Sequence, residues 1–222
     1  MHNLVVDSVR KLFDNKLVLS DIYLTCNTGE IIGLFGRNGS GKSTLLKVIS
    51  GNIAADFKFI KIDGKIITRQ TDLIASLGYL PQENFIPRGF TVQKAVKLSV
   101  GKSDVSNFFE DEMIRELWNQ KISNLSGGEL RYLEIKLVLS KNCAFALLDE
   151  PYNGLSPIIA EKVTHVIIEN SKHKGIIVTD HSYGNVLKIA TRIVLMNDGR
   201  CQPLENPQQL IEKNYLRDGM LP

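Results

Sequence analysis

The sequence predicts an α/β fold with a mostly parallel core sheet, an N-terminal antiparallel β subdomain and an inserted helical subdomain. Three observations predict it. The N-terminal part is rich in β-forming residues and carries a hairpin signal, and the C-terminal half alternates apolar strand-like runs with helical stretches. A more polar stretch, residues about 91–118, has a helical pattern and separates the two.

The N-terminal part is expected to form the antiparallel strands. Residues 2–7, 18–25 and 58–67 are β-rich. Within the last of these, Asp63-Gly64 lies between two apolar runs, which is a strong hairpin signal because both residues tolerate a left-handed backbone.

Strands and helices alternate in the remainder of the chain, which predicts a parallel sheet covered by helices. The apolar strands are expected at residues 30–35, 144–148, 175–178 and 193–196, the last of the sheet. Helices are expected at about residues 42–50, 157–172 and 182–190, with a short tail helix at about 207–215.

A complete phosphate-loop pattern, G-x-x-x-x-G-K-[ST], occupies residues 36–43 between an expected strand and an expected helix. Its glycines let successive backbone N–H groups point at phosphate oxygens, and the helix start adds partial positive charge. Lys42 is expected to reach the β- and γ-phosphates of ATP, Ser43 to hold Mg²⁺, and Thr44 to lie near the α-phosphate. The expected nucleotide-binding residues here are Gly36, Arg37, Asn38, Gly39, Ser40, Gly41, Lys42, Ser43 and Thr44.

Two acids, Asp149 and Glu150, follow the apolar strand 144–148. Acids at the carboxyl end of a central strand face the crevice where open α/β sheets bind ligands. Asp149 is expected to hold Mg²⁺, and Glu150 to act as the general base that polarises the attacking water. A solvated strand end is the alternative, and the phosphate loop disfavours it.

A second glycine-containing helix start, Leu125-Ser126-Gly127-Gly128-Glu129, opens a helix that runs to about Ser140. It is another anion site by the same physics. Two such loops could serve one nucleotide in a head-to-tail dimer, in which ATP would lie between the lysine loop of one copy and the Leu125–Glu129 segment of the other.

On these motifs the chain resembles the ABC ATPase family over nearly its whole length. The resemblance implies that Gln82, in Gly-Tyr-Leu-Pro-Gln-Glu, contacts Mg²⁺ and water in catalysis. It also implies that His181 contacts the γ-phosphate and that Phe13 stacks on adenine. Ser156 departs from the family pattern, because it stands where an acid normally helps to couple the two sites of the dimer.

The same resemblance implies a single nucleotide-binding domain over residues 1–222. Its core and β subdomain would comprise 1–82 and 125–222, and a reduced helical subdomain 83–124. Its partners would be integral-membrane permease subunits and a second cassette, either a copy of itself or a related chain. Within the family the chain resembles ATPases of lipopolysaccharide export and branched-chain amino-acid uptake, on the basis of Gly-Tyr-Leu-Pro-Gln-Glu followed by Arg88 and Thr91-Val92, with Arg131 and Glu134-Ile135.

The composition disfavours a membrane-spanning, a secreted or a nucleic-acid-binding protein. No apolar run approaches the ~20 residues of a membrane helix, and a secretory signal is not expected. Cys26, Cys143 and Cys201 are widely separated, which favours a reducing cytoplasm. We therefore expect a cytoplasmic protein, peripheral on the inner face of the cell membrane. A net charge of +3 does not favour nucleic acid.

Two alternatives compete with a transporter subunit. A soluble ABC ATPase, for example of the Fe–S assembly type, remains open. Another phosphate-loop class, such as a nucleotide kinase, has no use for the Leu125–Glu129 segment.

Overall fold

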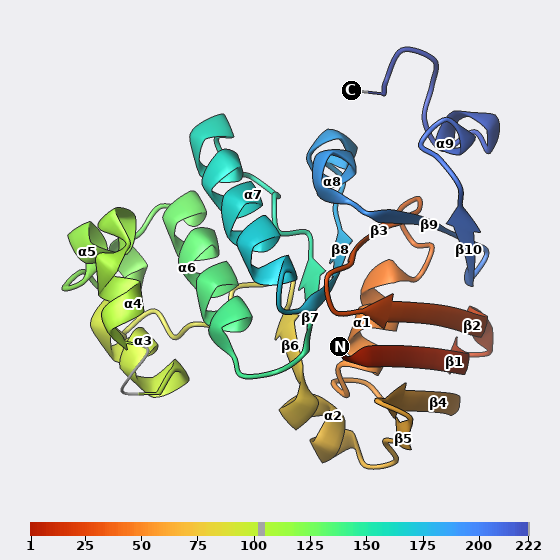
Figure 1. Ribbon diagram of the computed structural model, residues 1–222, viewed down its shortest axis with the longest axis horizontal. Helices are drawn as coiled ribbons and strands as arrows, with labels where there is room; N and C mark the ends of the chain where they lie inside the picture. Colours follow the sequence, from red (N-terminus) through yellow and green to blue (C-terminus); the bar gives the residue numbers. More distant parts are fainter. Residues whose placement is uncertain (102–104, 222) are drawn as a thin grey trace.

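A computed structural model describes residues 1–101 and 105–221 (Figure 1). Its larger sheet has the strand order β10-β9-β3-β8-β7-β6. These strands are β3 (Ile31–Phe35), β6 (Leu77–Leu80), β7 (Phe145–Asp149), β8 (Gly175–Thr179), β9 (Arg192–Asn197) and β10 (Arg200–Leu204). All neighbours pair in parallel except β9 and β10, so the predicted mostly parallel sheet is confirmed.

Two strands of this sheet were not expected. β6 is short, and its Leu-Gly-Tyr-Leu sequence is too brief to show a period. β10 follows β9 through a tight turn at Asp198-Gly199, where φ is 47° and 70°. The prediction that residues 193–196 form the last strand is therefore wrong, because this turn folds the chain back against β9.

The smaller sheet is antiparallel and has the order β2-β1-β4-β5. Its strands are β1 (Asn3–Phe13), β2 (Lys16–Asn27), β4 (Phe57–Ile62) and β5 (Lys65–Ile66). Asp63 and Gly64 have φ of 53° and 76°, as the hairpin signal predicts. β1 and β2 are longer than expected because Asp14 and Asn15, with φ of 46° and 66°, join them in a second tight hairpin.

The helices mostly follow the predicted pattern. They are α1 (Lys42–Ile49), α2 (Gln70–Ser76), α3 (Val92–Ser99), α4 (Val105–Glu110), α5 (Glu112–Leu117), α6 (Gly127–Ser140), α7 (Pro157–Ser171), α8 (Tyr183–Ile189) and α9 (Gln209–Glu212). α2 was not predicted. The helical stretch 91–118 contains α3 to α5, and its residues 102–104 lie outside the described residues. α9 is shorter than the expected 207–215, and Asn214 beyond it has a left-handed φ of 56°.

Side chains of the parallel strands divide between two cores because successive residues point to opposite faces. Ile32 and Leu34 of β3 belong to the core shared with α1 and the antiparallel sheet. Ile31 and Phe35 belong to the core shared with α6, α7 and α8. The sheet is thus covered on both faces, and the carboxyl ends of its parallel strands meet at one edge.

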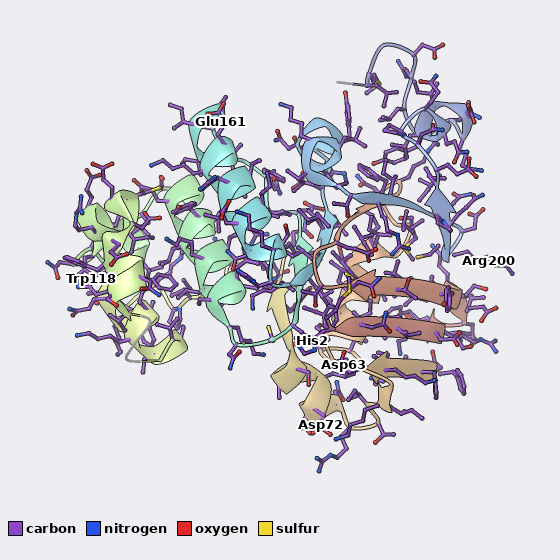
Figure 2. All side chains as sticks on the ribbon, in the orientation of Figure 1. His2, Asp63, Asp72, Trp118, Glu161 and Arg200 are labelled. Carbon is purple, nitrogen blue, oxygen red and sulfur yellow. The ribbon has the colours of Figure 1, made fainter. Side chains whose placement is uncertain are left out.

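The helical block α3 to α5 lies beyond α6 and α7, away from the antiparallel sheet (Figure 1). Figure 2 shows Trp118 in this block at one end of the molecule and Arg200 at the opposite end. No helix within the described ranges has both the length and the apolar character that crossing a bilayer demands.

Candidate active site

The loop between β3 and α1 has a backbone that favours glycine at two positions. Gly39 has φ of 77° and Gly41 has φ of 102°, both in the left-handed region. A Cβ at Gly41 would also lie 3.0 Å from the carbonyl oxygen of Val18. The two glycines therefore set the tight turn that precedes the start of α1 at Lys42.

Lys42 folds back over this loop. Its side chain is 7% exposed, and Nζ donates hydrogen bonds to the carbonyl oxygens of Gly36, at 2.6 Å, and Arg37, at 3.2 Å. Burial lowers the pKa of Lys42, while the nearby Glu150 and Asp149 oppose that shift. A buried ammonium that donates its hydrogen bonds to carbonyl oxygens is well suited to exchange them for charged phosphate oxygens.

Asp149 ends β7 with its side chain fully buried. Its Oδ1 accepts hydrogen bonds from Ser43 Oγ, at 3.0 Å, and Thr179 Oγ1, at 2.7 Å. Its Oδ2 is buried without a hydrogen-bond partner among the described residues. Because an unpaired buried carboxylate oxygen is costly, this atom fits a cation ligand.

The donor set around Asp149 suits Mg²⁺. In residues 1–101 and 105–221 there is no group of three or more His, Cys, Asp or Glu side chains that could hold a metal ion by itself. Mg²⁺ is commonly bound through one or two protein oxygens plus substrate phosphates and water. Ser43 and Asp149 supply such oxygens beside the phosphate loop.

Glu150 contacts both of the other predicted catalytic side chains, Gln82 and His181. Its Oε2 accepts a hydrogen bond from Gln82 Nε2 at 3.0 Å, and its Oε1 lies 3.1 Å from His181 Nε2. The Glu150 side chain is 8% exposed, and its backbone has a left-handed φ of 51°. Its N–H donates to the Thr179 carbonyl oxygen at 2.8 Å, so β8 supports the unusual conformation.

A cavity of about 470 Å³ joins these groups. It is lined by Phe13, Val18, Asn38, Gly39, Gly41, Lys42, Ser43, Thr44, Gln82, Glu150 and His181. Phe13 is 43% exposed at this cavity, and Lys11 Nζ lies over its ring, 4.9 Å from the ring centroid. The cavity thus combines the phosphate loop, Glu150 directly after β7 and an aromatic side chain.

Two predicted loop residues, Arg37 and Ser40, do not line this cavity. Arg37 donates from Nη2 to the carbonyl oxygen of Asn214 at 2.9 Å. The hydroxyl of Ser40 is buried and has no hydrogen-bond partner among the residues that the structure describes.

The Leu125–Glu129 segment is not part of the cavity lining of its own chain. Ser126 caps α6: its Oγ accepts from Glu129 N at 3.3 Å, and its N–H donates to Glu129 Oε2 at 2.7 Å. Gly128 backs onto Ile159 of α7, where a Cβ would lie 2.7 Å from the isoleucine side chain. This helix start is therefore preorganised at a place apart from the phosphate loop.

Thr179 and Asn153 were not among the predicted site residues. Thr179 holds Asp149, and Asn153 donates to Glu150 Oε2 at 3.4 Å. Thr179 could have been found, because it directly follows the predicted strand 175–178, two positions before His181, and carboxyl ends of parallel strands share one edge. For Asn153 no sequence signal was available.

The family model described as ABC transporter matches residues 19–153, which is more than half of the chain. This chain belongs to the ABC transporter family. The lipopolysaccharide export system ATP-binding protein LptB of Escherichia coli (strain K12) is 30% identical over 232 residues, covering 98% of this chain and 96% of the relative. The protein of the same name from Haemophilus influenzae is 29% identical over 231 residues, with 98% and 96% covered.

Solved structures share the fold. An ATP-binding subunit of an ABC transporter superposes with a TM-score of 0.83 at 20% identity, covering 97% of this chain and 94% of that one. The ADP conformation of MJ1267, an ATP-binding cassette of an ABC transporter, superposes with a TM-score of 0.75 at 24% identity, covering 99% and 96%.

Family membership establishes ATP binding and hydrolysis as the activity of this chain. The chain is an ATP-binding subunit of an ABC transporter and hydrolyses ATP. The relatives named above carry transport functions in their names, so the soluble alternative of the Fe–S assembly type gains no support.

Proposed function

We propose that the chain hydrolyses ATP as one half of a head-to-tail dimer that drives separate membrane subunits. The observation that carries this proposal is the separation of the two helix starts that are predicted to bind phosphate. The phosphate loop lines the cavity with Glu150, Gln82 and His181, whereas the Leu125–Glu129 segment does not. A second copy would bring its own Leu125–Glu129 segment to the open side of the triphosphate.

Five side chains of the cavity then have roles in ATP binding or hydrolysis. Lys42 releases the loop carbonyls and binds the β- and γ-phosphates, while Phe13 stacks on adenine. Glu150 takes the proton of the attacking water, and its contact with Gln82 orients the carboxylate. His181, 3.1 Å from Glu150, lies on the same side and contacts the γ-phosphate.

Ser43, Asp149 and Gln82 would hold Mg²⁺. Because the Gln82 amide nitrogen donates to Glu150, its carbonyl oxygen is the atom free to serve as a ligand. When bound, Mg²⁺ neutralises charge on the β- and γ-phosphates. Thr179 keeps Asp149 in place by donating to Oδ1, which leaves Oδ2 for the cation.

Membrane permease subunits are the proposed partners, and an apolar groove supports this. A cavity of about 480 Å³ lies between α6, β6 and the ends of α2 and α3, and Ile74, Phe85 and Leu137 are among its lining. Ile74 is 49% exposed and Phe85 is 43% exposed. Exposed apolar side chains around a groove indicate a protein-binding surface, here for a short permease helix.

The same proposal includes the domain boundaries and the location. Residues 83–124 act as the helical subdomain, and 1–82 with 125–222 act as the core with its β subdomain. The chain would be cytoplasmic and peripheral on the inner face of the cell membrane. Its likeness to LptB proteins supports a transporter of the lipopolysaccharide-export type.

Light scattering tests the dimer. Glu150→Gln with ATP and Mg²⁺ is expected to double in mass, because the unhydrolysed γ-phosphate joins two copies, and ADP should leave it monomeric. Adding Ser126→Arg should abolish the dimer while each copy still binds ATP, since that serine acts on the nucleotide of the partner. Single copies of Glu150→Gln with ATP demonstrably bound would refute the head-to-tail arrangement.

A further inference from the structure

One turn of α6 carries a buried ion pair. Arg131 and Glu134 are 5% and 0% exposed, and Nη1 of the arginine lies 3.5 Å from Oε2 of the glutamate. Charged side chains are rarely buried unless specific contacts compensate for lost hydration. Both side chains of this pair form hydrogen bonds with segments that border the ATP cavity.

Arg131 joins two separate segments. Its Nη1 donates to the carbonyl oxygen of Pro81 at 2.7 Å, and its Nη2 donates to those of Asp149, at 2.6 Å, and Glu150, at 3.0 Å. The planar guanidinium can satisfy these acceptors together because its donors point outward in a rigid fork. The end of β7 is thereby held at a fixed distance from the segment after β6.

Glu134 holds the same segment a few residues further on. Its Oε1 accepts a hydrogen bond from Phe85 N at 2.8 Å. Pro81 and Phe85 are therefore both fastened to α6, and Gln82 lies between them. The Gln82 side chain in turn donates to Glu150 Oε2 at 3.0 Å.

We propose that Arg131 and Glu134 are positioning residues for hydrolysis, which hold Gln82 and Glu150 in register with each other. This rests on the proposed roles of Gln82 and Glu150. Arg131 anchors the backbone on both sides of the Gln82–Glu150 contact, and Glu134 fixes the far end of the glutamine segment. The left-handed φ of 51° at Glu150 makes such an anchor useful, because an unfavourable backbone conformation persists only when its surroundings enforce it.

The pair also lies on the helix that connects the Leu125–Glu129 segment with the contact between Gln82 and Glu150. α6 begins at Gly127, directly after Ser126. One helix therefore carries both the Leu125–Glu129 segment, which is proposed to face the partner copy, and the Arg131–Glu134 pair. On its other side α6 reaches α5, where Lys136 Nζ lies 2.6 Å from Asp111 Oδ2. A shift of α6 against β7 would therefore displace the catalytic contact directly.

Arg131→Lys is the sharpest perturbation. Lysine keeps the positive charge beside Glu134, but its single ammonium cannot reproduce the fork that grips Pro81 and β7. We expect kcat to fall about 10²-fold, the loss typical of a displacement of about 1 Å in a catalytic group. The Kd for ATP should stay within about 2-fold, because the arginine does not line the nucleotide cavity.

Arg192→Lys is the matched control. Arg192 Nη1 pairs with Glu30 Oε2 at 3.0 Å and donates to the Thr25 carbonyl oxygen at 3.2 Å, away from the ATP cavity. The same chemical change there should leave kcat within about 2-fold. Glu134→Gln is a second variant that keeps an acceptor for Phe85 N–H, and it should lose less kcat than Arg131→Lys.

A double-mutant cycle closes the test. If Arg131 acts through Glu150, then Arg131→Lys in a Glu150→Gln background removes little further activity, so the two losses are far from additive. Additive losses, an unchanged kcat in folded Arg131→Lys, or a Kd for ATP weakened as much as kcat would each overturn the positioning role. Full activity of Glu150→Gln alone would instead refute the proposed function, and the positioning role with it.

Discussion

Glu150→Gln gives the most direct test of the proposed chemistry. The substitution keeps the shape of the side chain and removes only its charge and its ability to take a proton. Both contacts can persist, because the new amide oxygen can accept from Gln82 and the new NH₂ can donate to a neutral His181 ring. The geometry around the nucleotide should therefore survive while the base is lost.

The expected magnitude follows from general base catalysis, which contributes about 10²–10⁴ in rate. At 1.36 kcal/mol per tenfold, the barrier should rise by about 2.7–5.4 kcal/mol. Folding should not suffer. Burial raises the pKa of the adjacent Asp180 and the charge of Glu150 raises it further, so removing that charge relieves a repulsion. We expect the free energy of unfolding to stay within about 1 kcal/mol, or about 4 °C in Tm.

Phosphate release measures kcat, thermal unfolding measures stability, and a fluorescent ATP analogue measures nucleotide affinity. Glu161→Gln is the control, because it makes the same chemical change on the exposed surface of α7. A kcat within about 3-fold of the unmodified chain would exclude Glu150 as the base. A large fall in Tm would show that the lost rate came from misfolding.

Three further predictions concern other parts of the chain. Phe13→Ala should weaken ATP binding about 5- to 100-fold by titration, as expected for losing one base stack, whereas Phe57→Ala, also exposed, should not. Leu147→Ala in the fully buried β7 should lower the urea-derived free energy of unfolding by about 2–5 kcal/mol; a loss below about 1 kcal/mol would contradict that core position. Burial raises the pKa of Glu134 in the folded chain, although Phe85 N–H and Arg131 oppose it, so folding favours the protonated acid. The stability difference between the unmodified chain and Glu134→Gln should therefore decline as pH rises above the ordinary value of 4.5, and a flat difference over about pH 4–7 would contradict the shift.

Local patterns in the sequence predicted most of the fold. The Asp63-Gly64 turn, the strand–loop–helix context of Lys42 and the capped helix start at Ser126 each depend on neighbouring residues, and all have the expected form. The missed elements are those with weak local signals. β6 is too short to show a period, and β10 forms because the Asp198-Gly199 turn returns the chain to β9.

Sequence by itself determined the presence of a phosphate loop, an acid pair at a strand end and a second glycine-containing helix start, because each is a contiguous pattern with its own chemistry. Only the tertiary structure decided that Gln82 and His181 both reach Glu150, and that Arg131 and Glu134 fasten the segment around Gln82. These contacts join segments far apart in the chain, and they depend on the order in which β6, β7 and β8 pair. Strand order is a property of the packed core, which no single stretch of residues encodes.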